Sequence, residues 1–131
     1  MLTLKRAYEP YAESDGYRVL VDRLWPRGIR KDDAHLDAWP KALTPSDELR
    51  KWFHHDPEHW SEFRARYRRE LRSPAAKTLI DDLAKRTRRG NVTLVYSAHD
   101  QVHNGAIVLR DLIERAGGVT SKPRRPARPR A

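Results

Sequence analysis

Two short apolar runs, residues 17–21 (YRVLV) and 92–96 (VTLVY), constrain the fold more than any other part of the sequence. Both are rich in β-branched residues and almost continuously apolar, which is typical of strands buried on both faces. The first run is also a candidate for a central strand. Each run ends in a polar loop, and helical sequence patterns fill the chain between them. The two runs are therefore predicted to be parallel strands joined by a right-handed helical crossover.

Three helix starts are predicted between the runs, because a capping side chain is followed by proline at residues 44–45, 56–57 and 73–74. A last helix is expected over residues 102–116, and residues 2–7 alternate like a half-buried strand. The chain is therefore predicted to be α/β, with a small, partly parallel sheet of three to four strands and helices packed around it. The second helix carries an apolar stripe whose helical spacing favours the core over base stacking: Trp60, Phe63, Tyr67 and Leu71.

Cysteine usage and charge limit the classes of function. The chain has no cysteine, which excludes disulfides, thiolate catalysis and cysteine-rich zinc sites and suits the reducing cytoplasm. We find no signal peptide and no apolar run of membrane-spanning length, so a cytoplasmic location without a membrane partner is expected. The net charge is +9, and residues 122–130 contribute five basic residues and no acid. We expect one domain over residues 1–118 and a disordered basic tail, rich in proline and arginine, over residues 119–131.

The loops that follow the two apolar runs form the predicted site, because ligands in open α/β sheets lie beyond the carboxyl ends of the strands. Asp22 is an acid–base candidate directly after the first run, and His55 is a second one. Guanidinium groups suit a nucleotide- or phosphate-like anion. The alternative is that Asp22 pairs with neighbouring charges and only holds the loop in place. The candidate ligand-binding residues are Arg23, Arg27, Tyr96, Ser97, Asp100 and Asn104.

Other chemistry has less support in the sequence. His99, Asp100 and His103 have ligand types that a transition metal accepts, but helix capping by Asp100 explains the same spacing, so we assign no metal. The glycine-rich phosphate loops of dinucleotide- and triphosphate-binding proteins are absent, as is the GxSxG motif of a nucleophile elbow. No cofactor, reaction or oligomeric state follows from the sequence.

An arginine-rich helix face supports an alternative function. The second predicted helix presents basic side chains with few acids beside them, and together with the basic tail they suit a non-enzymatic nucleic-acid-binding or regulatory interaction protein. No helix-turn-helix, zinc-finger or RNA-binding signature accompanies them, and a solvated helix face is the simpler interpretation. The residues concerned are Arg64, Arg68, Arg69 and Arg72.

Three blocks of the chain, residues 15–39, 45–71 and 92–109, resemble the YeaO-like family of small bacterial proteins, a domain of unknown function. The resemblance covers nearly all of residues 1–116. It implies a compact cytoplasmic α/β protein and supplies no established reaction or cofactor. The positions that match the family's motifs are Asp22, Arg23, Trp25, Pro26, Arg27, Gly28, Trp39, Ser46, Arg50, Trp52, Phe53, His55, Asp56, Pro57, Trp60, Phe63, Tyr67, Tyr96, Ala98, Asp100 and Asn104.

The chain departs from the resemblance at Gly105, where the family usually has histidine. This weakens any mechanism that needs an imidazole at that position. Longer members of the superfamily carry a cysteine–histidine–arginine run nearby. Because this chain has no cysteine, their thiol chemistry does not transfer to it.

Overall fold

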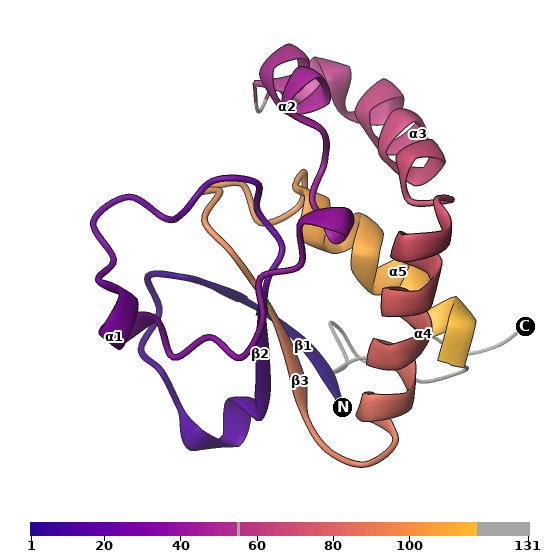
Figure 1. Ribbon diagram of the computed structural model, residues 1–131. Coiled ribbons are helices and arrows are strands. Elements are labelled where there is room, and N and C mark those ends of the chain that lie inside the picture. The colour runs from indigo at the N-terminus through magenta and orange to yellow at the C-terminus, as the bar shows by residue number, and fades with distance from the viewer. Residues whose placement is uncertain (55, 118–131) are drawn as a thin grey trace, which may run out of the picture.

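A sheet of three parallel strands, in the order β1-β3-β2, forms the centre of the molecule (Figure 1). The computed structural model describes residues 1–54 and 56–117. The predicted α/β class is confirmed, and the two apolar runs are parallel neighbours. However, β3 is the central strand, because the N-terminal strand pairs with its other edge. The strands are β1 (Leu2–Arg6), β2 (Tyr17–Leu20) and β3 (Val92–Tyr96).

The outer edge of β2 is partly covered, which explains how an edge strand can have such an apolar sequence. The backbone N–H of Leu20 donates to the carbonyl of Ala38 at 3.0 Å, and that of Asp37 donates to the carbonyl of Arg18 at 2.8 Å. These bonds satisfy backbone groups that an edge strand otherwise exposes. The loop that follows β2 therefore returns to pack beside the strand.

Helices cover one face and one end of the sheet (Figure 1). The last two helices pack against each other and against the strands, whereas the second and third stand over the carboxyl ends of the strands. Neither these helices nor the others in the described residues are long and apolar enough to cross a bilayer. The predicted tail, residues 119–131, lies outside the described residues. The helices are α1 (Lys31–Ala34), α2 (Asp47–Phe53), α3 (Trp60–Glu70), α4 (Pro74–Thr87) and α5 (Gly105–Gly117).

Three helix starts differ from the prediction. α3 begins at Trp60, after a 3-10 turn over Pro57–His59 that Asp56 caps. The cap of α2 is Ser46 and not the predicted Thr44. The Ser46 side chain accepts from the N–H of Leu49 at 3.1 Å. The Thr44 hydroxyl instead donates to the Lys41 carbonyl at 2.8 Å. α5 begins three residues later than expected, because residues 100–103 form a separate turn. The capping residue predicted for α4, Ser73, does accept from the helix at 3.2 Å.

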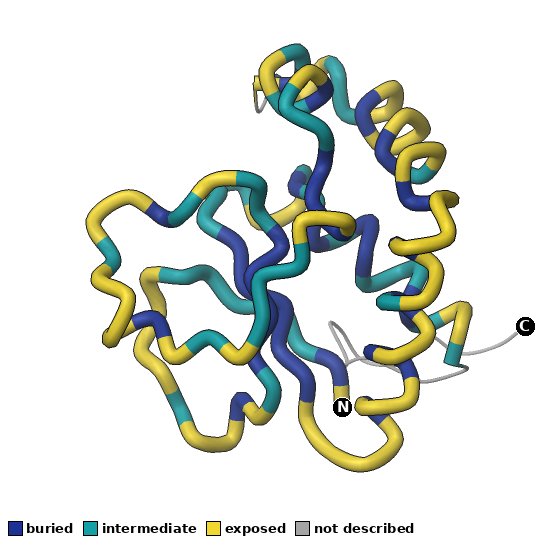
Figure 2. Tube along the Cα trace, viewed as in Figure 1, coloured by how far each residue is buried: buried dark blue, intermediate teal, exposed yellow. Residues whose placement is uncertain are grey.

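The hydrophobic core lies between the helices and one face of the sheet, and the central strand β3 is buried along its length (Figure 2). Val19 and Leu94 face it from neighbouring strands. The predicted apolar stripe of α3 is confirmed as core, with Phe63 stacked on Phe53 at 4.1 Å between ring centroids. Tyr67 is fully buried. The aromatic side chains of this stripe are thus used for packing.

The opposite face of the sheet carries a buried ionic network. Asp15 accepts from Arg18 at 2.6 Å and from Lys5 at 3.0 Å. The Arg18 guanidinium also donates to the carbonyl of Ala34 at 3.0 Å. Desolvation alone raises the pKa of Asp15, but its hydrogen bonds and the two cations outweigh this and lower the pKa below its ordinary value. The network joins β1 and β2 across β3.

Candidate functional site

A pocket of about 450 Å³ opens at the carboxyl ends of the strands. Asp22 and Arg23, after β2, line one side of it, and Ser97 and Asn104, after β3, line the other. The end of β1 and the end of α2 complete the wall. The two strand ends named by the sequence therefore meet in one pocket, because β2 and β3 are parallel neighbours.

Asp22 joins the ends of two strands. Its Oδ2 accepts from the backbone N–H of Ser97 at 2.8 Å and from the Ser97 hydroxyl at 2.6 Å. Its backbone carbonyl accepts from the indole N–H of Trp39 at 2.7 Å. These bonds hold the loop against β3.

Four arginines line the pocket, whereas Asp22 is the single acid among the lining residues described. Arg6 donates to the carbonyls of Ser97 and Ala98 at 2.8 Å each, and so its guanidinium is fixed at the end of β1. Arg23 donates to the Thr44 hydroxyl at 3.2 Å. The charge balance of the pocket is strongly positive, which favours an anion. The four are Arg6, Arg23, Arg27 and Arg50.

Arg50 reaches the pocket from α2. Its Nη2 lies 2.5 Å from Asp47 Oδ1, while its Nε is buried and has no hydrogen-bond partner. A buried donor without an acceptor is uncommon and is satisfied readily by a ligand. Arg50 was singled out only by the resemblance. Arg6 had no signal in the sequence beyond its place at the end of a predicted strand.

Aromatic and apolar side chains form part of the same wall. Phe53 and Phe63 contribute from the core, and Leu24 is 55% exposed. The indole N–H of Trp25 donates to the carbonyl of Ile29 at 2.7 Å, and its ring meets that of Trp39 edge-on at 5.5 Å. The rigid indole and the fixed arginines give the pocket both an apolar and a cationic surface.

Two predicted ligand-binding residues lie outside the pocket wall. Tyr96 is 5% exposed in β3, and burial, its largest influence, raises the pKa of its hydroxyl. Asp100 accepts from the N–H groups of Val102 and His103 at 2.9 Å each, and its Oδ2 lies 2.8 Å from His103 Nδ1. These bonds, led by that of Val102, lower the pKa of Asp100 to about 2. Asp100 thus caps the turn before α5.

Asn104 lines the pocket but is already engaged in capping α5. It is 2% exposed, its Oδ1 accepts from the N–H of Ile107 at 3.2 Å, and its Nδ2 donates to the Asp100 carbonyl at 2.9 Å. Its side chain therefore stabilises the helix start beside the pocket.

Replacing Asn104 with alanine should lower the free energy of unfolding by about 1–2 kcal/mol, because the helix loses its cap. Asn104→Ser keeps a capping oxygen and should recover most of that loss. Urea unfolding followed by tryptophan fluorescence measures both. An alanine variant as stable as the parent protein would contradict the capping role.

Two of the described histidines, His54 and His99, line the pocket. Within the described residues, no three histidine or carboxylate side chains are placed to share a metal ion. His99 lines the pocket and is exposed. His54 also lines it and adopts a left-handed backbone conformation (φ 45°), which is uncommon outside glycine and was not signalled by the sequence. His55, the second acid–base candidate, lies outside the described residues.

A family profile described as the inactive DUF488-N3 subclade matches residues 1–131. The uncharacterised protein YeaO of Escherichia coli K12 is 49% identical over 109 residues, which cover 82% of this chain and 91% of YeaO. The chain belongs to the YeaO-like family. The uncharacterised proteins Rv3073c of Mycobacterium tuberculosis H37Rv and Mb3100c of Mycobacterium bovis are each 46% identical to this chain over 108 residues, covering 82% of this chain and 89% of theirs. No solved structure matches significantly.

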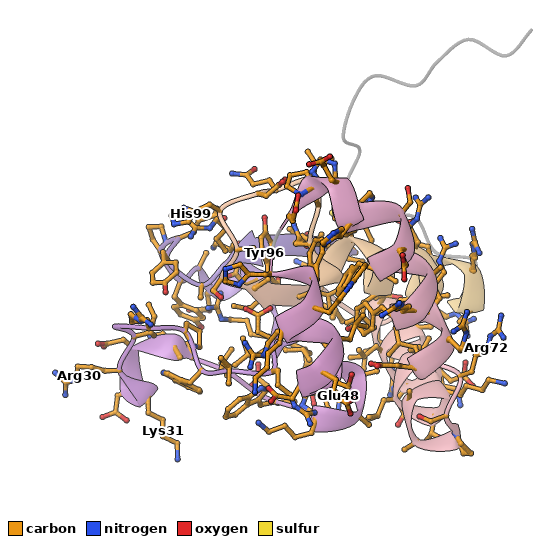
Figure 3. All side chains as sticks on the ribbon, turned by 90° about the horizontal axis from the view of Figure 1, so that it is seen from above. Arg30, Lys31, Glu48, Arg72, Tyr96 and His99 are labelled. Atoms are coloured by element: carbon orange, nitrogen blue, oxygen red, sulfur yellow. The ribbon has the colours of Figure 1, made fainter. Side chains whose placement is uncertain are left out.

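The arginine-rich face of this YeaO-like protein is separate from the pocket. Three of its predicted residues lie on α3 and Arg72 lies in the turn after it, and none of the four lines the pocket. In Figure 3, Arg72 projects from the side opposite His99. Arg64, Arg69 and Arg72 are exposed, and Arg68 is half-buried. The two candidate functions of the sequence therefore fall on different surfaces.

Proposed function

We propose that this YeaO-like protein binds a small anionic ligand, nucleotide- or phosphate-like, in the pocket at the strand ends and holds it without converting it. The observation that carries the proposal is the convergence of four guanidinium groups on one pocket with a single described carboxylate. They come from β1, from the loop after β2 and from α2. Guanidinium groups bind phosphate and carboxylate through paired hydrogen bonds, so this arrangement suits an anion.

The apolar part of the pocket supports a ligand with a flat organic portion. Trp25 and Tyr8 are held by hydrogen bonds to the carbonyls of Ile29 and Arg27, at 2.7 and 2.9 Å. Both rings line the pocket beside the arginines. A nucleotide combines a planar base with phosphate, and both parts have a matching surface here. Such ligands are available in the cytoplasm, the location that we propose.

Two observations support binding without turnover: the hydrogen bonds that Asp22, the candidate base, already accepts, and the description of the family. One oxygen of Asp22 already accepts two hydrogen bonds from Ser97, so the carboxylate has a structural task. The chain has no cysteine for thiol chemistry. The family that matches the whole chain carries the word inactive in its description.

A thermal-shift screen with nucleoside monophosphates, sugar phosphates, inorganic phosphate and small carboxylates should identify at least one stabilising ligand. Arg23→Gln and Arg27→Gln should each weaken its binding about tenfold or more, because each removes a charge-assisted hydrogen bond. Arg30→Gln is the matched control, since Arg30 is exposed and lies outside the pocket wall. It should leave the affinity unchanged.

Two results would count against the proposal. An undiminished thermal shift in the Arg23→Gln/Arg27→Gln double variant would place the ligand elsewhere. Chemical conversion of the bound ligand, detected by chromatography after prolonged incubation, would contradict binding without turnover. The absence of any shift across the panel would remove the ligand site altogether.

A further inference from the structure

A second cationic surface surrounds a hollow of about 480 Å³ where α3 ends, α4 begins and α5 ends. We call it the helix-end hollow. Each helix contributes at least one basic side chain to it, and Asp81 is the single acid in its described lining. Its lining also includes apolar side chains, among them Ile80 of α4 and Leu112 of α5. The basic residues are Arg68, Arg72, Lys77 and Arg115.

The cations of the helix-end hollow are available to a partner. None of the ion pairs formed within the described residues includes them. The Nε of Arg68 is buried and has no hydrogen-bond partner. By contrast, Arg66 on the same helix pairs with Glu62 and stacks on the Trp52 ring at 4.4 Å. On α3, Arg66 therefore has an acidic partner within the described residues, whereas Arg68 has none.

Further basic side chains lie beyond the hollow, along α3 and near the end of α5. Along α3, Arg64 and Arg69 are exposed and extend the basic face. At the end of α5, the Gly117 carbonyl accepts from Arg88 at 3.2 Å, close in sequence to Arg115. The chain that follows has five basic residues and no acid over residues 122–130. This charge is more than one small anion needs and suits a polyanion.

We propose that the helix-end hollow and the exposed arginines of α3 bind the phosphate backbone of double-stranded nucleic acid. The described lining of the hollow has no aromatic side chain, so it lacks the stacking platform that single strands use. It has cations from three helices, which suit phosphate contacts independent of sequence. This surface lies away from the strand-end pocket, and the inference does not depend on the small-ligand proposal.

Fluorescence anisotropy with a labelled DNA duplex, and with an RNA duplex of the same sequence, tests the proposal on the full chain. The logarithm of the binding constant should fall linearly with the logarithm of salt concentration. Arg68→Gln/Arg72→Gln should weaken binding about tenfold and reduce the salt slope by about two, since each phosphate contact contributes about 0.9. Comparing the duplexes distinguishes DNA from RNA as the partner.

Matched variants keep the result interpretable. Arg64→Gln/Arg69→Gln changes only exposed side chains and should also weaken binding, even if the Arg68 variant disturbs packing. Arg30→Gln/Lys31→Gln removes the same charge from the opposite side of the molecule (Figure 3) and should change the affinity less than about twofold.

Four outcomes would overturn the inference. These are duplex binding that is insensitive to salt, equal losses in the α3 and Arg30/Lys31 variants, tighter binding to a single strand than to a duplex, and preferential binding to vesicles of anionic phospholipid. The last would show that the basic surface docks on membranes.

Discussion

Replacing Asp15 with alanine should lower the free energy of unfolding by about 3–5 kcal/mol, because it leaves the Arg18 guanidinium buried without its counter-charge. The Arg18 side chain is 3% exposed, and its Nη1 lies 2.6 Å from Asp15 Oδ2. Lys5, at 3.0 Å, loses the same partner. Urea unfolding at neutral pH, followed by tryptophan fluorescence, measures the loss.

Asp47→Ala provides the matched control for this prediction. Asp47 also accepts from two cations, Arg50 at 2.5 Å and Lys51 at 3.1 Å, but this group lies at the surface. Its removal should affect stability far less, because exposed ion pairs contribute little. Equal losses in the Asp15 and Asp47 variants would contradict the role of burial.

The pH dependence of stability gives an independent measure of the same network. The pKa of Asp15 is lower in the folded protein than in the unfolded chain, so its ionised form favours folding. This contribution is complete above about pH 5 and is lost as the pH falls through the folded pKa. Asp15→Asn should therefore show a shallower loss of stability on acidification. Asp100, whose pKa is lowered to about 2, titrates in both proteins and does not affect the comparison.

The second large effect is expected for Gly16→Ala, with a loss of roughly 3 kcal/mol in the free energy of unfolding. Gly16 has a φ of 68°, and a Cβ there would lie 2.2 Å from the carbonyl oxygen of Asn91. That oxygen cannot withdraw without cost, since it accepts from the N–H of Tyr17 at 2.9 Å. The backbone strain and the clash therefore add, and thermal and urea unfolding should both record them.

Gly28→Ala is the control that measures the backbone strain of a positive φ without a steric clash. Gly28 also has a positive φ, 81°, but nothing lies within 4 Å of a Cβ built there. Its substitution should cost only about 1 kcal/mol, the strain of a left-handed conformation. A Gly16 variant no less stable than the Gly28 variant would show that the Asn91 carbonyl yields easily.

Helix and strand positions could be predicted well because their signals are local. A capping side chain followed by proline marks residues 73–74, and α4 begins there. The α3 stripe repeats at helical spacing, and its aromatic residues are core. The start of α2 could not be chosen between Thr44 and Ser46 by type alone. A tertiary contact distinguishes them, because Glu70 of α3 accepts from the Ser46 N–H at 2.8 Å and from its hydroxyl at 2.6 Å.

The composition of the pocket was only partly predictable. Asp22, Arg23 and Ser97 follow apolar strands directly, and parallel strands bring their carboxyl ends to one edge. Arg6 and Arg50 come from elements that are distant in sequence from both ends. Their place in the pocket depends on β1 pairing with β3 and on α2 standing over the strand ends. Hydrophobic patterns carry no information on either arrangement.

By itself, the sequence determined most helix and strand positions and the motif residues of the family, because capping, periodicity and motifs are local properties of the chain. The tertiary structure alone decided which cations share a surface. It joined arginines from three segments into one pocket and basic residues from three helices into the helix-end hollow. The physical reason is that burial of the apolar faces sets how the elements pack, and polar side chains take the positions that this packing leaves at the surface.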